Sequence, residues 1–310
     1  MADIKIGFHY SRLYDLVPIP EFARLAEEMG LDSVWLPEGL VNEVPALDIL
    51  MGMSGFIHHT RNITIGASVV LLPLRNPVVL AKEVSTLDLL SGGRVVLGIG
   101  AGGPPDSNPT SFQACGVSMR ERGARTDEAL EIMTKLWTGA PVSHQGRFYS
   151  FQDIVMEPRP AQRPHPPIWA GGAAEGMLRR AAHWCDGFVP VGVNPEEYGA
   201  LWDRIQRYGE TYQRDTTGMT KAVHLFYRVG NSREEARRAG EEVLNRRRGF
   251  DLTLADDDRY AFGTAGDCMR TVERFVDAGI THFIFNALVP DAEVMGQVDR
   301  LVEEIVPYFK

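Results

Sequence analysis

Two polar residues and two glycine-rich segments could carry chemistry in this 310-residue chain. His9 and Glu38 each follow a short apolar run, and either side chain could give or take a proton. A histidine held by hydrogen bonds at a rim, and a loop carboxylate held in an ion pair, are the open alternatives for these two residues. The glycine-rich segments are 98–103 and 171–174.

The segment 171–174, Gly-Gly-Ala-Ala, joins an apolar run to the start of an expected helix. Free backbone N–H groups and the helix dipole at such a position suit an anion such as a phosphate. A tight turn that merely needs glycine is the alternative. Glu175 in the first turn opposes an anion, whereas Arg179 and Arg180 could offset its charge or face solvent.

The segment 98–103 matches the pattern G-x-G-x-x-G letter for letter. A dinucleotide-binding turn requires a helix directly after this pattern and an acidic residue about 20 positions on. Pro104-Pro105 and a long polar loop follow here instead, so the sequence argues against a Rossmann site. We expect these glycines to let a flat ring or its side chain pass close to the backbone.

The elements that must position these residues alternate between strand and helix along the chain. Eight apolar runs, each followed by a helical pattern, lie at 4–8, 33–36, 63–72, 94–99, 167–170, 187–191, 223–229 and 281–286. Their continuous apolar character is typical of parallel strands buried on both faces. We predict an α/β fold, a single (β/α)₈ TIM barrel over 1–310 with insertions after strands 4 and 7; a doubly wound open sheet is the alternative. The site then lies in the loops at the strand C-termini.

The composition excludes several classes of protein. A hydrophobic fraction of 44% indicates a globular chain, and a net charge of −9 without a basic stripe argues against nucleic acid or a membrane surface as partner. No long apolar stretch or signal peptide pattern is present, so we expect a cytoplasmic protein. Cys115, Cys185 and Cys268 are expected to be buried, and no spacing predicts a metal site.

Several segments together resemble the bacterial luciferase-like superfamily of flavin- and deazaflavin-dependent oxidoreductases. The resemblance covers essentially the whole chain and is carried by residues 68–77, 87–100, 122–130, 158–160, 166–172, 263–264 and 278–283. It implies a barrel that binds FMN or coenzyme F-420 (F420) across the strand C-termini, with the phosphate at 171–173 and the ring against the end of the third strand. Many relatives hold a non-proline cis peptide there, which would fall between Ser68 and Val69.

These arguments define the predicted site. The cofactor-binding residues are Ser68, Val69, Gly100, Ala101, Gly102, Gly171, Gly172, Ala173 and Ala174, and the catalytic residues are His9 and Glu38. Residues 100–119, too long for an ordinary connection, are expected to form a lid over the ring.

Two departures from the family pattern bear on the cofactor. Relatives often carry an acidic residue and then His after the second strand, but Gly39 follows Glu38 here. Deazaflavin-dependent sugar-phosphate and alcohol dehydrogenases have Glu after the fourth-strand glycines, where this chain has Gly103-Pro104. The missing His favours FMN over F420.

We therefore predict a luciferase-like monooxygenase that uses reduced FMN and oxygen on a small organic substrate. An F420-dependent hydride-transfer oxidoreductase and a non-catalytic flavin-binding barrel are the alternatives. A flavin reductase that supplies reduced FMN, and further copies of the chain in a homodimer or larger homo-oligomer, are the expected protein partners.

Overall fold

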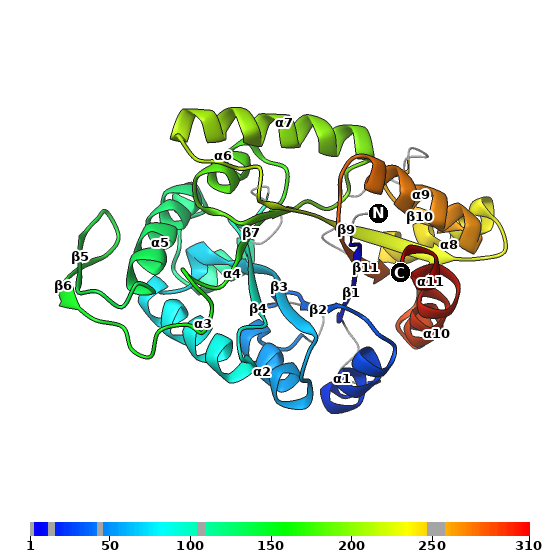
Figure 1. The fold of residues 1–310 in the computed structure, drawn as a ribbon, viewed down its shortest axis with the longest axis horizontal. Coiled ribbons are helices and arrows are strands. Elements are labelled where there is room, and N and C mark those ends of the chain that lie inside the picture. The colour runs from blue at the N-terminus through cyan, green and yellow to red at the C-terminus, as the bar shows by residue number, and fades with distance from the viewer. Residues whose placement is uncertain (1–2, 12–15, 42–45, 104–108, 247–257) are drawn as a thin grey trace.

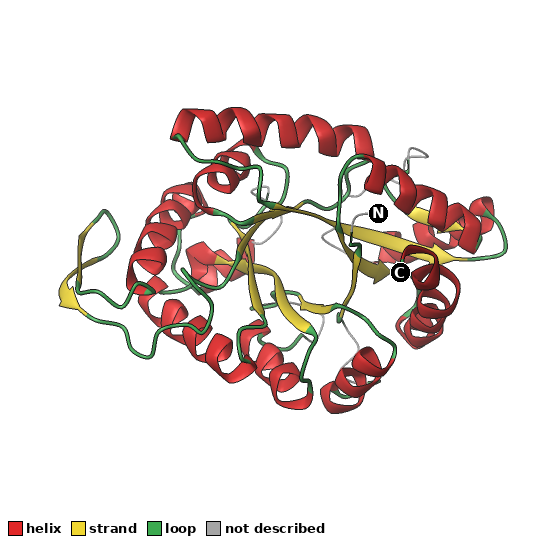
Figure 2. Ribbon diagram, in the orientation of Figure 1, coloured by secondary structure: helices red, strands yellow, loops and turns green. Residues whose placement is uncertain are grey.

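The structure is a computed structural model that describes residues 3–11, 16–41, 46–103, 109–246 and 258–310. Eight parallel strands form a closed barrel ringed by helices (Figures 1 and 2), as the sequence predicts. In order around the ring they are β1 (Lys5–His9), β2 (Ser33–Leu36), β3 (Thr64–Leu71), β4 (Val95–Gly100), β7 (Ile168–Gly171), β8 (Gly187–Val189), β9 (Thr220–Val229) and β11 (His282–Ala287). The pairing of β8 with β9 closes the ring, so the open-sheet alternative is wrong.

Helices cover the outside of the barrel and return the chain to the N-terminal end of each next strand. The longer ones are α1 (Ile19–Glu28), α2 (Ile49–His59), α3 (Pro77–Ser91), α5 (Arg122–Leu136), α6 (Glu175–Trp184), α7 (Pro195–Tyr212), α8 (Arg233–Arg246) and α9 (Ala265–Asp277). Local sequence fixes their ends. Asn76 caps α3 by accepting the N–H groups of Val78 and Val79, and Gly92 ends it in the left-handed region.

The helical pattern after the last apolar run forms a series of short pieces rather than one helix. These are η3 (Asp291–Glu293), α10 (Val294–Arg300), the π-helical η4 (Leu301–Ile305) and α11 (Val306–Phe309). Pro307 has no N–H to continue an α-helical ladder, which accounts for a change of hydrogen bonding next to it.

Both predicted insertions are present. After β4, the chain forms α4 (Pro109–Ala114), η2 (Met119–Glu121), α5 and an antiparallel hairpin of β5 (Val142–Gln145) and β6 (Ser150–Ile154). The hairpin projects from the ring of helices at the left of Figure 1. After β9, α8 leads to β10 (Ala261–Gly263), which pairs with the far end of β9 outside the barrel. Of the expected lid, residues 104–108 lie outside the described residues.

Two glycines leave space for the tryptophan side chains inside the barrel. A Cβ on Gly66 would lie 2.1 Å from the Trp35 ring, and one on Gly187 would lie 2.5 Å from the Trp169 ring. Without those side chains, the two buried indoles approach to 4.9 Å between ring centroids in the centre of the barrel. They pack there with Ala222 and Ile284.

The expected burial of the three cysteines is right for two of them. Cys185 and Cys268 are buried, and burial raises the pKa of the Cys268 thiol to about 12. The expectation is wrong for Cys115, which is exposed just after α4, a helix of only six residues. Among the described residues, no helix is long and apolar enough to cross a membrane.

Candidate active site

The barrel brings most of the predicted site residues to one end. His9 is the last residue of β1, Gly100 ends β4, Gly171 ends β7, and Ser68-Val69 lies in the last half of β3. Glu38 lies two residues after β2. Because the strands are parallel, all these positions lie at the C-terminal mouth of the barrel.

The peptide bond between Ser68 and Val69 is cis, as the resemblance predicts. The register between β3 and β4 shifts at this point, between Ala67 and Val70. The shift places the Val69 side chain across the neighbouring strands. A Cβ on Gly100 or Gly171 would lie 2.7 Å from a methyl group of Val69.

The glycines of the G-x-G-x-x-G segment therefore make room for side chains of this chain. Gly98 and Gly100 lie on β4, next to β3. A Cβ on Gly98 would lie 2.0 Å from the Ala67 carbonyl oxygen of β3. Gly102 has φ +101°, and its Cβ would lie 2.6 Å from the Phe112 ring. The close approach expected of a ring to these glycines is thus made by Val69 and Phe112, and the cofactor contacts of Gly100, Ala101 and Gly102 stay a prediction.

The loop 171–174 leads into α6 with the geometry of an anion site. Ala173 and Ala174 are exposed, Gly172 has φ +89°, and a Cβ on Gly172 would meet nothing within 4 Å. The N–H groups of Met177 and Leu178 both donate to the Ala174 carbonyl oxygen. The backbone N–H groups that precede Met177 therefore have no acceptor within the helix, as is usual at a helix N-terminus.

The charge of Glu175 is offset by arginines. Its carboxylate pairs with Arg204 of α7 and, at 3.5 Å, with Arg179. Arg180 does not face this loop, because it is bonded to Asp127 and to the Gly123 carbonyl on α5. The loop therefore remains suited to an anion.

Glu38 lies in a partly buried network of charges. Its side chain is 6% exposed and pairs at 2.8 Å with Arg75, which also pairs at 2.9 Å with Asp48. Glu38 accepts the Leu71 N–H as well, at 3.2 Å. Burial opposes the charge of the Arg75 guanidinium, but its two carboxylate partners outweigh burial and raise the pKa of Arg75. The geometry matches the ion-pair alternative, and a catalytic role for Glu38 stays a prediction.

A polar cluster of three side chains lies beside these groups, on β1 and the two strands that follow it around the ring, β11 and β9. Asn286 Nδ2 lies 3.2 Å from His9 Nδ1 and 3.1 Å from His224 Nε2. The two imidazole rings lie 4.6 Å apart between centroids. The strand period of two puts them together, since His224 and Asn286 lie two residues beyond the interior side chains Ala222 and Ile284.

The electrostatics keep His224 uncharged. Burial first, and the neighbouring His9 second, lower the pKa of His224 well below its ordinary value of 6.5. A second positive charge at this ring separation costs roughly 3–4 kcal/mol at an effective dielectric constant of 20. The mouth therefore offers a neutral imidazole at His224 with the Asn286 amide beside it, and these groups can orient a substrate oxygen.

His224 was missed by the sequence analysis, which also gave Asn286 no role. The available signal was a polar side chain, His224 or Asn286, within each of two largely apolar runs, 223–229 and 281–286. Among the described residues, no group of three His, Cys, Asp or Glu side chains could hold a metal ion.

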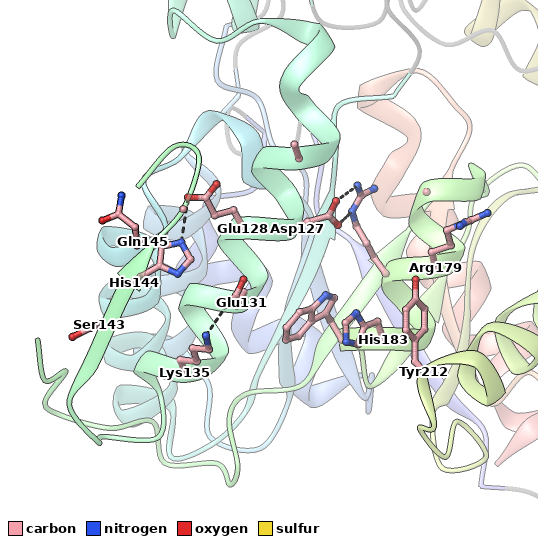
Figure 3. Close-up of a pocket in the computed structure, with 15 residues that line it drawn as sticks. Asp127, Glu128, Glu131, Lys135, Ser143, His144, Gln145, Arg179, His183 and Tyr212 are labelled. Atoms are coloured by element: carbon pink, nitrogen blue, oxygen red, sulfur yellow. Dashed lines mark hydrogen bonds and ion pairs between the residues drawn. The ribbon is translucent and has the colours of Figure 1, made fainter. Parts of the chain in front are cut away.

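A separate groove lies on the outside of the barrel. It has a volume of about 650 Å³ and is lined by α5, the β5 strand and α6, with Tyr212 at the end of α7 (Figure 3). Its charged groups are partnered within the groove, as in the pairs Lys135–Glu131 and Arg180–Asp127. None of the predicted site residues lines it.

A closed parallel barrel whose glycine-rich loop and polar cluster lie at the strand C-termini has the architecture of an α/β-barrel enzyme. Residues 8–306 match the family model described as luciferase-like monooxygenase, and the chain belongs to this family. It is accordingly an oxidoreductase of the flavin- or F420-dependent kind, as its relatives are.

Three similar proteins illustrate the range of the family. An F420-dependent glucose-6-phosphate dehydrogenase of Microbacterium testaceum is 28% identical, with 93% of this chain and 91% of that protein covered. The monooxygenase RslO1 of Streptomyces bottropensis has the same fold, with a TM-score of 0.82, 22% identity and 99% and 100% of the two chains covered. An F420-dependent secondary alcohol dehydrogenase, solved with an F420-acetone adduct, gives a TM-score of 0.81 and 22% identity over 99% of both chains.

Proposed function

We propose that this chain transfers a hydride between F420 and a small organic substrate held at the C-terminal mouth of the barrel. The cluster of His9, Asn286 and His224 carries the proposal, because it places two imidazoles and an amide where they can hydrogen-bond a substrate oxygen. The F420-dependent relative from Microbacterium testaceum, which aligns with 93% of the chain, supports this choice of cofactor over the FMN that the sequence analysis favours.

The residues present fit such a cofactor. The open loop at Gly172 and the N-terminus of the ten-residue helix α6 would hold its phosphate, with Gly171, Ala173 and Ala174 alongside. The cis bond at Ser68-Val69 shapes the wall against which the ring would lie, next to 100–102. When bound, the cofactor supplies the hydride chemistry, and the protein supplies binding, orientation and exclusion of water.

Different groups of the chain would bind the cofactor and orient the substrate. His9 lies across the barrel from the loop 171–174, since β7 and β1 are four strands apart in the eight-strand ring. The ion pair of Glu38 and Arg75 ties the loop after β2 to the loop after β3. His9 and His224 hold the substrate oxygen between the cofactor and the barrel wall.

A second candidate is oxygen-dependent monooxygenation with reduced FMN. The observation that favours it is Gly39 after Glu38, in place of the His that the resemblance associates with deazaflavin-dependent members. This candidate requires a flavin reductase as partner. A homodimer or larger homo-oligomer is proposed for either candidate.

Cofactor binding and oxygen dependence separate the candidates. The purified chain is titrated with F420 and with FMN while cofactor fluorescence is followed, and turnover is then measured on a panel of small alcohols and carbonyl compounds with and without oxygen. Tight F420 binding with turnover in the absence of oxygen supports the proposal. Tight FMN binding with strictly oxygen-dependent product supports the second candidate, and failure to bind either cofactor contradicts both.

A further inference from the structure

The hydrogen bonds of Asn286 determine which ring nitrogens of the two histidines carry protons. Asn286 is 7% exposed, and its amide nitrogen Nδ2 lies within hydrogen-bonding distance of His9 Nδ1 and His224 Nε2. A primary amide nitrogen has two hydrogens and no lone pair to offer, so it donates in both contacts. Both of the imidazole nitrogens that it contacts are therefore acceptors.

A neutral imidazole has one donor and one acceptor nitrogen. With Nδ1 of His9 accepting, its proton is on Nε2; with Nε2 of His224 accepting, its proton is on Nδ1. In His9, the N–H is on the ring nitrogen that does not contact Asn286. The acceptor nitrogens of both rings are occupied by the amide, and what the rings present elsewhere is N–H.

We propose that Asn286 is a positioning residue that fixes His9 as the Nε2–H tautomer and His224 as the Nδ1–H tautomer, so that the mouth of the barrel binds its substrate through an acceptor oxygen, as in a ketone or an aldehyde. This inference rests on the proposed function for its substrate class, but not for the tautomers. Val191, just after β8, pairs with His224, and His9 is the titratable group that acts on His224 among the described residues.

The reaction that follows is reduction of a carbonyl group. When bound, reduced F420 would supply the hydride and the two electrons that convert the carbonyl compound into an alcohol, and the proton of the new hydroxyl group would come from solvent. The Nε2–H of His9 would donate a hydrogen bond to the substrate oxygen as negative charge develops on it.

The tautomers can be measured without any cofactor. Two-bond ¹H–¹⁵N correlations of the eight histidine rings in the ¹⁵N-labelled chain at about pH 7.5 distinguish the two tautomers, and His9→Gln and His224→Gln assign the signals. We expect Nε2–H for His9 and Nδ1–H for His224. The opposite tautomer at either ring in the unmodified chain overturns the inference.

Asn286→Asp provides the sharper variant, because a carboxylate accepts where the amide donates. We expect both rings to change to the opposite tautomer or to become protonated. The signals of His282, deeper in the same barrel and bonded to Ser33, should stay unchanged as the internal control. If the His9 and His224 signals do not move in Asn286→Asp, Asn286 does not set their tautomers.

Kinetics test the substrate class. Asn286→Leu keeps the size of the side chain without the donor, and should lower kcat for ketone reduction on the order of 10²-fold while the F420 Kd changes less than about threefold. If the expected tautomers are observed but the chain reduces no ketone or aldehyde, the carbonyl substrate class is wrong and the role of Asn286 in setting the tautomers still holds. Absence of F420 binding would instead contradict the proposed function, so the two failures are distinguishable.

Discussion

His9 is the residue whose replacement should separate catalysis from cofactor binding. It lies on β1, across the barrel from the loop 171–174, so its loss should leave the phosphate contacts intact. We expect His9→Ala to lower kcat/KM on the order of 10²-fold, the usual effect of a group that handles a proton or a developing charge, with little change in cofactor Kd. His183→Ala, an exposed histidine stacked on Tyr212, is the matched control and should be silent. Normal kcat/KM in His9→Ala would exclude His9 from the chemistry.

Glu38 allows a comparable distinction between a structural and a catalytic role. The ion pair of Glu38 with Arg75 is nearly buried, so we expect Glu38→Gln to lower the free energy of unfolding by roughly 2–4 kcal/mol. The loss is limited because the Arg75 guanidinium keeps Asp48 as a partner. Urea unfolding measures this loss, and activity per folded molecule should change little. A large loss of kcat with unchanged stability would instead assign Glu38 to catalysis.

At the scale of elements, the loop after β7 can be tested with a single charge. Gly172→Asp places a carboxylate where a phosphate is expected, and like charges in a partly buried site repel by several kcal/mol. We expect at least a 10²-fold rise in cofactor Kd. Gly172→Asn is the control, because it imposes a similar backbone penalty at φ +89° without the charge. Equal affinities in the two variants would remove the phosphate from this loop.

The sequence predicted the elements that are long and apolar, and missed those that are short or polar. All eight barrel strands were expected near their observed positions, because continuous apolar runs between helical patterns are unambiguous. The hairpin β5–β6 is absent from the strands that the sequence predicts, since only alternate residues such as Val142 and His144 are buried in β5 and most of β6 is exposed. It forms because Glu128 of α5 accepts the N–H groups of the hairpin turn, a tertiary contact that no local pattern contains.

The same difference applies to the site. The position of the loop 171–174 between a strand and a helix was predictable from its glycines, and its role as a phosphate site stays a prediction. The partners of His9 were not, because Asn286 is 277 residues away in sequence and only closure of the barrel brings them together. The filling of the 98–103 glycines by Val69 and Phe112 likewise depends on packing between segments.

For the whole molecule, the buried histidines link stability to pH. Burial lowers the pKa of His282 from 6.5 to about 4, and burial together with His9 lowers the pKa of His224. Between about pH 6.5 and 4, the unfolded chain therefore binds protons at these rings that the folded chain does not. Stability is complete above pH 6.5 and falls as the pH drops through this window.

Carboxylates add to this loss mainly at lower pH. The pKa values of Asp48, Asp258 and Asp267 are lowered in the folded state, so their stabilisation is present above the ordinary aspartate pKa of 3.8 and is lost below it. Burial raises the pKa of Glu83, which acts in the opposite sense. The histidines should consequently dominate between about pH 6.5 and 4.5.

His282→Gln tests this linkage. The amide of Gln can still bond to Ser33 but does not titrate, so the variant should lose less stability between pH 6.5 and 4.5 than the unmodified chain. The decrease in the pKa of His282 from 6.5 to about 4 corresponds to a loss of roughly 3 kcal/mol in the free energy of unfolding over the full window, at 1.36 kcal/mol per pH unit. Urea unfolding at steps of about half a pH unit measures the difference, with exposed His183→Gln as the control. Identical pH dependence in His282→Gln and the unmodified chain would show that His282 takes up its proton in the folded barrel as readily as in the unfolded chain.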